Sequence, residues 1–268
     1  WKLDLSKTSL EEDDSSMYTL SKMFSSEGSL ANDRFGYNQM ASTLVNSSSP
    51  AGTHLFQYFG TGDQAHIQTR YPSIANRLYG VKDLDWPDTA LTITGSNKTV
   101  SSTGILNIDG AACDVTDVPG WFTNVKTKAT LDNPPLGDGT DNMKVIGRAI
   151  VANKDVYFTV YRPEDKECPA YGSGETIKLK EGCGGGVETI AIGAGLTTAP
   201  VMDKKGNIYV GVSNLATGET LEGKGDTSEM EGISGRDNIL KIGTSEMTSS
   251  AGTPGIKIKS WREITGNY

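Results

Sequence analysis

The chain has 268 residues, of which 36% are hydrophobic, and its mean hydropathy is −0.37, values that allow a buried core and favour a water-soluble domain. The net charge is −8 and Lys and Arg form no basic stripe, which argues against a nucleic-acid partner because phosphate neutralisation needs clustered cations. No apolar stretch approaches the roughly 18 residues that cross a bilayer. The chain opens on Trp1 without an initiator Met, so we expect a processed product or a fragment.

Short β-branched and aromatic runs, bounded by turn residues, follow one another along the chain, and a helical pattern occurs only weakly near Leu20–Leu30. The strands predicted in the first half are Trp1–Leu5, Met17–Phe24, Gln39–Val45, Leu55–Gly60, Arg77–Lys82, Leu91–Thr94, Ile105–Ile108 and Trp121–Val125. Those predicted in the second half are Lys144–Ala152, Val156–Tyr161, Glu175–Lys180, Ala199–Met202, Asn207–Val212, Asn238–Ile242 and Lys257–Ile264. The sequence therefore predicts an all-β fold.

Three of these strands are joined to the strand before them by clear turn sequences. The predicted turns are Asn46–Gly52, Asn153–Asp155 and Asp203–Gly206. Each combines Asn, Asp, Gly or Pro between two apolar runs, which is typical of β-hairpins. We expect Gly206 to adopt a positive φ.

Three strand-and-turn phrases resemble one another: Phe56–Gly62, Val156–Tyr161 and Asn207–Val212, with a shorter relative at Asn76–Lys82. Such degenerate repetition is typical of a radially repeated fold, because every blade needs the same central strand. At about 40 to 45 residues per blade the length would hold six blades. Grouped into four-stranded blades, the predicted strands make only three to four blades. We therefore predict an incomplete β-propeller.

The three cysteines are Cys113, Cys168 and Cys183. Cys168 and Cys183 flank a predicted strand, and a disulfide between them would close a loop of about 15 residues and contribute about 3 kcal/mol. The alternative is three free thiols in a reducing compartment. Both readings stay open at this point.

In order along the chain, several strands resemble the C-terminal propeller of the PilY family, the tip-associated biogenesis factors and adhesins of type IV pili. The phrases that carry the resemblance are Trp1–Leu5, Tyr58–Gly62, Leu78–Asp83, Gly120–Phe122, Lys144–Ile146, Val156–Tyr161, Cys168 with the glycines that follow it, and Ser260–Ile264. Each phrase is short, so the resemblance is supported by the ordered set of phrases and not by any one of them.

The resemblance implies a modified, quinoprotein-like β-propeller, with residues 1–268 as the C-terminal portion of one domain. Loop insertions near 63–73, 126–143 and 216–235 would then be contact surfaces, most clearly at Asp63–Ser73, Leu131–Asp141 and Glu219–Glu231. The remaining blades would come from an upstream segment or another chain.

The implied function is non-enzymatic: support of pilus biogenesis, control of retraction and surface adhesion. The implied place is extracellular, at the pilus tip or cell surface, after transit through the periplasm or outer membrane. The implied partners are minor pilins or the pilus tip complex, and a surface or host receptor. Calcium occurs in the family, but its loop motif has no counterpart here, because Asn107–Asp114 loses its alternate oxygen ligands at Ala111.

Patterns that would carry chemistry are weak. The two histidines, His54 and His66, are predicted to be exposed loop residues, and the acidic runs read as solvated faces. The glycines around Cys183 lack the Lys and helix of a phosphate-binding loop. We therefore predict no catalytic residue, no cofactor and no metal site. The alternatives are a quinoprotein-type propeller dehydrogenase and a carbohydrate-binding propeller lectin.

Overall fold

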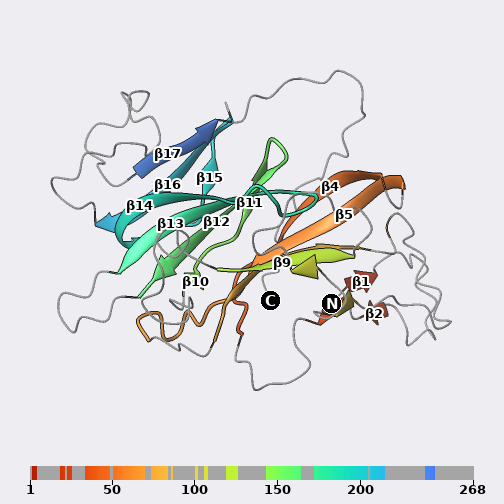
Figure 1. The fold of residues 1–268 in the computed structure, drawn as a ribbon, viewed down its shortest axis with the longest axis horizontal. Coiled ribbons are helices and arrows are strands. Elements are labelled where there is room, and N and C mark those ends of the chain that lie inside the picture. The colour runs from red at the N-terminus through yellow and green to blue at the C-terminus, as the bar shows by residue number, and fades with distance from the viewer. Residues whose placement is uncertain are drawn as a thin grey trace, which may run out of the picture.

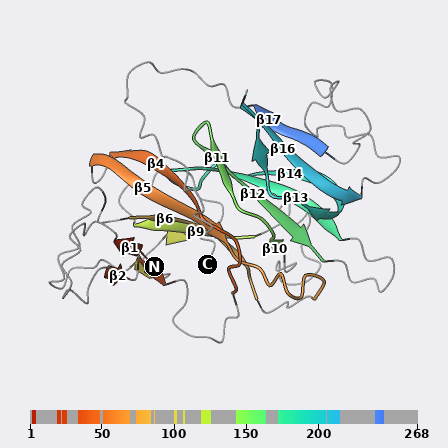
Figure 2. The ribbon, with the colours of Figure 1, turned by 180° about the vertical axis from the view of Figure 1, so that it is seen from behind.

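All regular structure in the described part of the chain is β-strand. The computed structural model describes residues 2–4, 19–21, 23–25, 34–48, 51–69, 74–83, 86, 100–101, 106–107, 119–125, 143–163, 172–204, 206–214 and 239–244. Figures 1 and 2 show the first strands, orange to yellow, on one side of the molecule and the later strands, green to blue, on the other. The all-β prediction is confirmed, and the weak helical pattern after Leu20 contains only short strands where it is described.

The first sheet is an antiparallel meander of four strands with one short parallel strand at its edge. Its order is β4 (Ala41–Ser48), β5 (Ala51–Gly60), β6 (Arg77–Lys82), β9 (Gly120–Asn124) and β8 (Leu106–Asn107). The β4–β5 hairpin is longer than predicted, because the strands pair as far as Ser48 with Ala51 and leave only two residues between them.

The second sheet segment repeats this arrangement. Its strands are β10 (Lys144–Val145), β11 (Ile150–Ala152), β12 (Asp155–Arg162), β13 (Ser173–Lys180) and β14 (Glu188–Thr197). The single strand predicted at Lys144–Ala152 is wrong in detail, because it is interrupted between β10 and β11, which both pair with β12. The predicted turn that follows has positive φ at Asn153 (52°) and Lys154 (65°), as a tight hairpin requires.

A third sheet segment continues from β14. The strand β14 itself was not predicted from the sequence. The first part of β14 pairs with β13, its last residues pair with β16, and the register shifts between Ala194 and Thr197. The strands of this segment are β15 (Val201–Met202), β16 (Asn207–Asn214) and β17 (Ile239–Thr244). Separately, β1 (Lys2–Asp4) pairs with β2 (Thr19–Ser21), and β3 (Phe24–Ser25) runs parallel to β7 (Val100–Ser101).

The sheets are stacked in chain order, with apolar cores between them. The core between the first sheet and the second segment contains Phe56, Tyr58, Leu78, Trp121, Val156, Phe158, Val160 and Ile177. The core between the second and third segments contains Tyr157, Ile192, Ile208, Val210 and Ile242. Because neighbouring strand residues point to opposite faces, Phe158 and Tyr157 serve different cores. Serial stacking of antiparallel sheets, in which the middle segment is covered on both faces, is the packing of propeller blades.

Two hydrogen bonds join the first sheet to the β13–β14 turn across this interface. The Tyr58 hydroxyl donates to the Glu181 carbonyl oxygen at 2.9 Å, and Trp121 Nε1 donates to the same oxygen at 3.4 Å. Burial, with a smaller effect of the Glu181 charge, raises the pKa of Tyr58 far above its ordinary value, so the hydroxyl stays a donor. The largest aromatic side chains of the first sheet therefore position a turn of the next.

The three repeated phrases occupy equivalent places. They form β5, β12 and β16. In chain order β5 follows β4, β12 follows β10 and β11, and β16 follows β15, and each pairs with the strands that it follows. Gly60, within the first phrase, is needed for close approach and not for a turn. A Cβ on Gly60 would lie 2.4 Å from Val145 Cγ2, so only glycine lets β10 pack there. The sequence repetition thus reflects repeated sheet positions.

Candidate functional site

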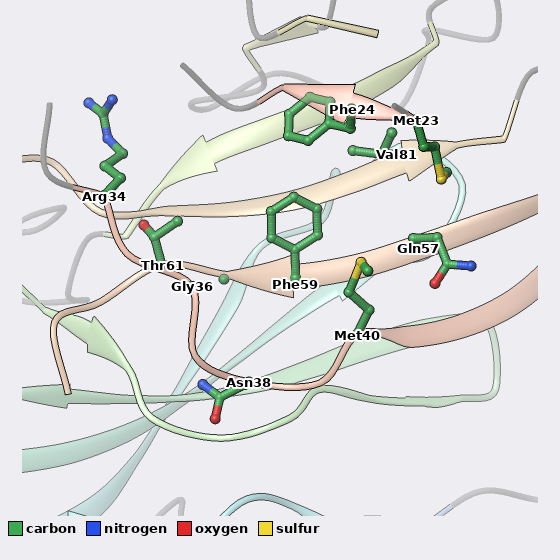
Figure 3. Close-up of a pocket in the computed structure, with 11 residues that line it drawn as sticks. Met23, Phe24, Arg34, Gly36, Asn38, Met40, Gln57, Phe59, Thr61 and Val81 are labelled. Atoms are coloured by element: carbon green, nitrogen blue, oxygen red, sulfur yellow. The ribbon is translucent and has the colours of Figure 1, made fainter. Parts of the chain in front are cut away.

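A pocket of about 260 Å³ opens on the face of the first sheet that is turned away from the second segment. Figure 3 shows β5 and β6 beneath it, β3 on one side and the segment of residues 34–40 on the other. The lining residues are Met23, Phe24, Arg34, Gly36, Asn38, Met40, Gln57, Phe59, Gly60, Thr61 and Val81. This site was not predicted, because its parts come from four separated stretches of sequence.

An aromatic cluster forms the apolar wall of the pocket. The Phe59 ring stacks on Tyr79 at 4.9 Å between centroids, and Phe24 meets both rings edge-on at 5.6 and 5.4 Å. Phe59 and Tyr79 are cross-strand partners, so the β5–β6 register places these two rings together. Met23 and Met40 add flexible side chains that adapt to different occupants.

The polar groups of the pocket are mostly uncharged amides. Gln57 Oε1 accepts a hydrogen bond from the Ser42 hydroxyl at 2.6 Å, and Asn38 Nδ2 donates to the Val145 carbonyl oxygen at 3.5 Å. Arg34 is the one ionisable residue of the lining, and its Nε donates to the Ala75 carbonyl oxygen at 2.6 Å. General acid–base catalysis needs a positioned titratable pair. The lining offers instead an apolar surface with hydrogen-bonding amides, which suits binding of an uncharged or aromatic group.

Exposed apolar side chains continue from the pocket along the same segment. Phe35, Tyr37 and Met40 are 45%, 53% and 45% exposed, and the Phe35 and Tyr37 rings lie 6.1 Å apart. The Phe35 carbonyl oxygen accepts a hydrogen bond from the Gly62 amide at 2.8 Å, which ties the segment to the end of β5. Met40 lines the pocket, whereas Phe35 and Tyr37 lie beside it in the same segment, and we call the pocket together with these exposed side chains the pocket surface. Exposed apolar patches of this kind mark interaction sites.

Asp63–Ser73 was predicted to be a contact surface. The structure describes this loop as far as Thr69, and that part is held by the second sheet segment. The buried Lys144 ammonium donates to three loop carbonyl oxygens, those of His66, Ile67 at 3.1 Å and Thr69 at 2.6 Å. The Tyr161 hydroxyl also donates to Gln68 Oε1 at 2.9 Å. This part of the loop is therefore anchored to β10 and β12.

Two charged groups order the ends of this loop. Asp63 accepts from the Ala65 and His66 amides and from His66 Nδ1 at 2.8 Å. Burial would raise the pKa of Asp63, but these hydrogen bonds outweigh it and the net pKa is lowered. Loss of hydration lowers the pKa of Lys144, although the Asp63 charge opposes this change. The described part of the loop is therefore held by the Asp63 carboxylate at its start and by the Lys144 ammonium at residues 66–69.

The turn before β16 is closed by its own side chains. Asp203 accepts from the Asn207 amide at 2.9 Å, the Asn207 side chain at 2.8 Å and the Tyr209 hydroxyl at 3.2 Å. Gly206 has φ of 85°, which confirms the expected positive value. Since the Asp203 carboxylate is used within the hairpin, this turn is structural.

The predicted candidate residues are dispersed in the structure. His66 lies in the anchored loop and its side chain is 64% exposed, as predicted. The prediction for His54 is wrong, because it lies within β5 and is only 9% exposed. Within the described ranges, no three His, Cys, Asp or Glu residues gather in a way that could hold a metal ion. In the same ranges, no helix is long and apolar enough to span a membrane.

Cys183 forms a disulfide bond. Cys113 and Cys168 lie outside the described residues, so the pairing with Cys168 stays a prediction. Also outside are the predicted loops Leu131–Asp141 and Glu219–Glu231, most of Asn107–Asp114 and the terminal phrase Ser260–Ile264.

Comparison with known proteins gives a structural similarity but no match to a family model or a curated protein. Among solved structures, the chain is similar to the C-terminal domain of Pseudomonas aeruginosa PilY1, with a TM-score of 0.42 and 15% sequence identity. The similarity covers 65% of this chain and 43% of that domain, so the chain spans less than half the length of that neighbour.

Proposed function

We propose that this chain is a non-enzymatic binding component of a type IV pilus, placed at the pilus tip or cell surface, where it supports pilus biogenesis, retraction control and adhesion. Minor pilins or the tip complex, and a surface or host receptor, are its proposed partners. The stacked sheets act as a rigid scaffold, and the pocket surface is the contact region. Blades beyond those described would come from an upstream segment or another chain.

The observation that carries this proposal is the place of the family-like phrases. Tyr58–Gly62, Leu78–Asp83, Gly120–Phe122, Lys144–Ile146 and Val156–Tyr161 all lie in or directly beside strands that pack on the core between the first two sheets. Because these phrases meet in one core, their side chains are under common packing constraints. Their order along the chain therefore supports the resemblance to the PilY family more strongly than isolated matches would. The amide-rimmed, aromatic pocket supports binding over catalysis.

The genetic test is deletion of the gene in its host, followed by counting of surface pili and measurement of twitching motility. Loss of piliation or motility that the intact gene restores is expected. Normal pili and motility after deletion would contradict the proposal.

A matched pair of variants tests the role of the pocket surface. Tyr37 is 53% exposed, and Tyr37→Lys places a charge on the pocket surface. Val201 is 59% exposed, and Val201→Lys places a charge on the third sheet segment. Both variants should fold, because neither side chain is in a core. We expect only Tyr37→Lys to fail in restoring adhesion to the deletion strain. Equal restoration by both would remove the pocket surface from the function.

A further inference from the structure

Cys183 is disulfide-bonded, and the sequence offers two partners for it. These are Cys113, which follows β8, and Cys168, which follows β12, and both lie outside the described residues. A disulfide joins residues whose Cα atoms are no more than about 6.8 Å apart. The place of Cys183 in the fold therefore tests each partner.

The turn between β13 and β14, which carries this cysteine, packs against the first sheet. The Glu181 carbonyl oxygen accepts hydrogen bonds from the Tyr58 hydroxyl at 2.9 Å and from Trp121 Nε1 at 3.4 Å. A Cβ on Gly182 would lie 3.3 Å from Val45 Cγ1. The two residues directly before the cysteine are therefore in contact with β5, β9 and β4.

This turn lies at one end of β13. The Lys180 amide donates to the Gly185 carbonyl oxygen at 2.9 Å, which closes the β13–β14 hairpin and leaves residues 181–184 beyond it. At the other end, the Gly172 carbonyl oxygen accepts from the Gly195 amide at 3.0 Å, so the chain is still paired with β14 there. Eight residues of extended strand, from Gly172 to Lys180, span about 25 Å.

Cys168 belongs to the loop at the far end of β13. Arg162 pairs with Ser173, so this loop begins and ends at the edge of the hairpin that is remote from the turn. Cys168 precedes Gly172 by four residues, which span at most about 14 Å when fully extended. Even a straight run back along β13 would stop about 11 Å short of Lys180, which is beyond the reach of a disulfide.

Cys113 belongs to the connection between β8 and β9 in the first sheet. Leu106 of β8 pairs with Trp121 of β9, whose indole reaches the β13–β14 turn. Cys113 follows Asn107 by six residues and precedes Trp121 by eight, so it can lie as far as about 20 Å from either strand. The turn that carries Cys183 is within that reach.

We propose that Cys183 forms its disulfide with Cys113, so that a covalent bond joins the first sheet to the second sheet segment. When the bond forms, the two thiols lose two protons and two electrons, and a disulfide oxidant accepts them and becomes a dithiol. This pairing replaces the predicted one with Cys168, whose thiol is left without a cysteine partner in the chain. The inference goes beyond the proposed function and does not depend on it, since it concerns the purified chain alone.

Peptide mapping of the parent chain tests the pairing without any substitution. Trypsin, which cleaves after Lys and Arg, places the three cysteines on three different peptides, 99–126, 167–178 and 181–204. The chain is oxidised in a glutathione redox buffer, free thiols are blocked with N-ethylmaleimide before digestion, and mass spectrometry identifies the linked peptides. We expect 99–126 joined to 181–204, with 167–178 linked to neither. Any other linkage among the three, or three blocked cysteines, would overturn the proposal.

Serine variants test what the bond does for stability. Cys113→Ser and Cys183→Ser each open a cross-linked loop of about 70 residues, and each should lower the melting temperature by about 10 °C. The double variant should melt with the single variants, because both substitutions delete the same bond. Cys168→Ser is the matched control and should melt with the parent chain. A loss in Cys168→Ser equal to that in Cys183→Ser, with none in Cys113→Ser, would contradict the pairing.

Discussion

The two faces of the first sheet differ in how completely they are covered, although the same strands supply both. On one face, Phe56, Tyr58 and Trp121 are at most 3% exposed against the second segment. On the other, Tyr79 and Phe122 are buried, but Phe59 is only partly so and a pocket remains open beside it. The first face holds the fold together through a closed core. The second leaves apolar surface available for binding.

The largest expected effect comes from opening the closed face. Trp121→Ala removes a side chain that is 1% exposed and packs beside Tyr58. We expect a loss of about 3–5 kcal/mol in the free energy of unfolding, measured by denaturant titration. Phe59→Ala on the open face is the matched comparison and should cost clearly less, because the pocket already leaves that ring partly uncovered. Equal losses would contradict the contrast between the faces.

Removing the Lys144 ammonium should have the next largest effect. Lys144→Met keeps the length of the side chain but removes the ammonium that donates to three loop carbonyl oxygens, of which that of His66 keeps its hydrogen bond from the Thr69 amide. Unsatisfied buried groups cost about 1–3 kcal/mol. Hydrogen exchange should accelerate in residues 63–69 while the β12–β13 ladder stays protected. Unchanged exchange in this loop would show that Lys144 does not order it.

A smaller loss is expected when one of the two bonds to the β13–β14 turn is deleted. Tyr58→Phe keeps the ring but removes the hydroxyl that donates to the Glu181 carbonyl oxygen. Since Trp121 Nε1 still reaches that oxygen, we expect a loss of about 1 kcal/mol in the free energy of unfolding. Ser42→Ala, which removes a hydrogen bond on the exposed face, should be nearly neutral and serves as its control.

The smallest effect concerns pH. The folded-state pKa of Asp63 is lowered, so its contribution to stability is present above its unfolded pKa of about 3.9 and is lost as the pH falls through the folded value. Asp63→Asn keeps an oxygen that can accept the backbone hydrogen bonds but cannot titrate. Melting temperatures measured from pH 6 down to pH 2 should fall more steeply in the parent chain. Parallel curves would contradict this assignment.

Local patterns in the sequence were sufficient for strands whose character is visible in neighbouring residues. β5, β12 and β16 are dense in aromatic and β-branched residues, and the sequence predicted each of them because such side chains suit a half-buried or buried strand. β14 was missed although it begins with the β-branched residues Thr189, Ile190 and Ile192, because Gly193, Ala194 and Gly195, which carry no strand preference, follow them. Its conformation is set by pairing with β13 and β16 on its two sides.

The amino-acid sequence by itself determined the all-β class, most strands and the repetition that marks equivalent sheet positions, because these depend on side chains one or two residues apart. Only the tertiary structure decided where those strands meet. Lys144 and the loop it holds are some 75 residues apart in the chain, and Phe24 and Phe59 belong to different sheets. Burial of an ammonium among carbonyl oxygens, and a pocket left between two sheets, are consequences of long-range packing that no local pattern contains.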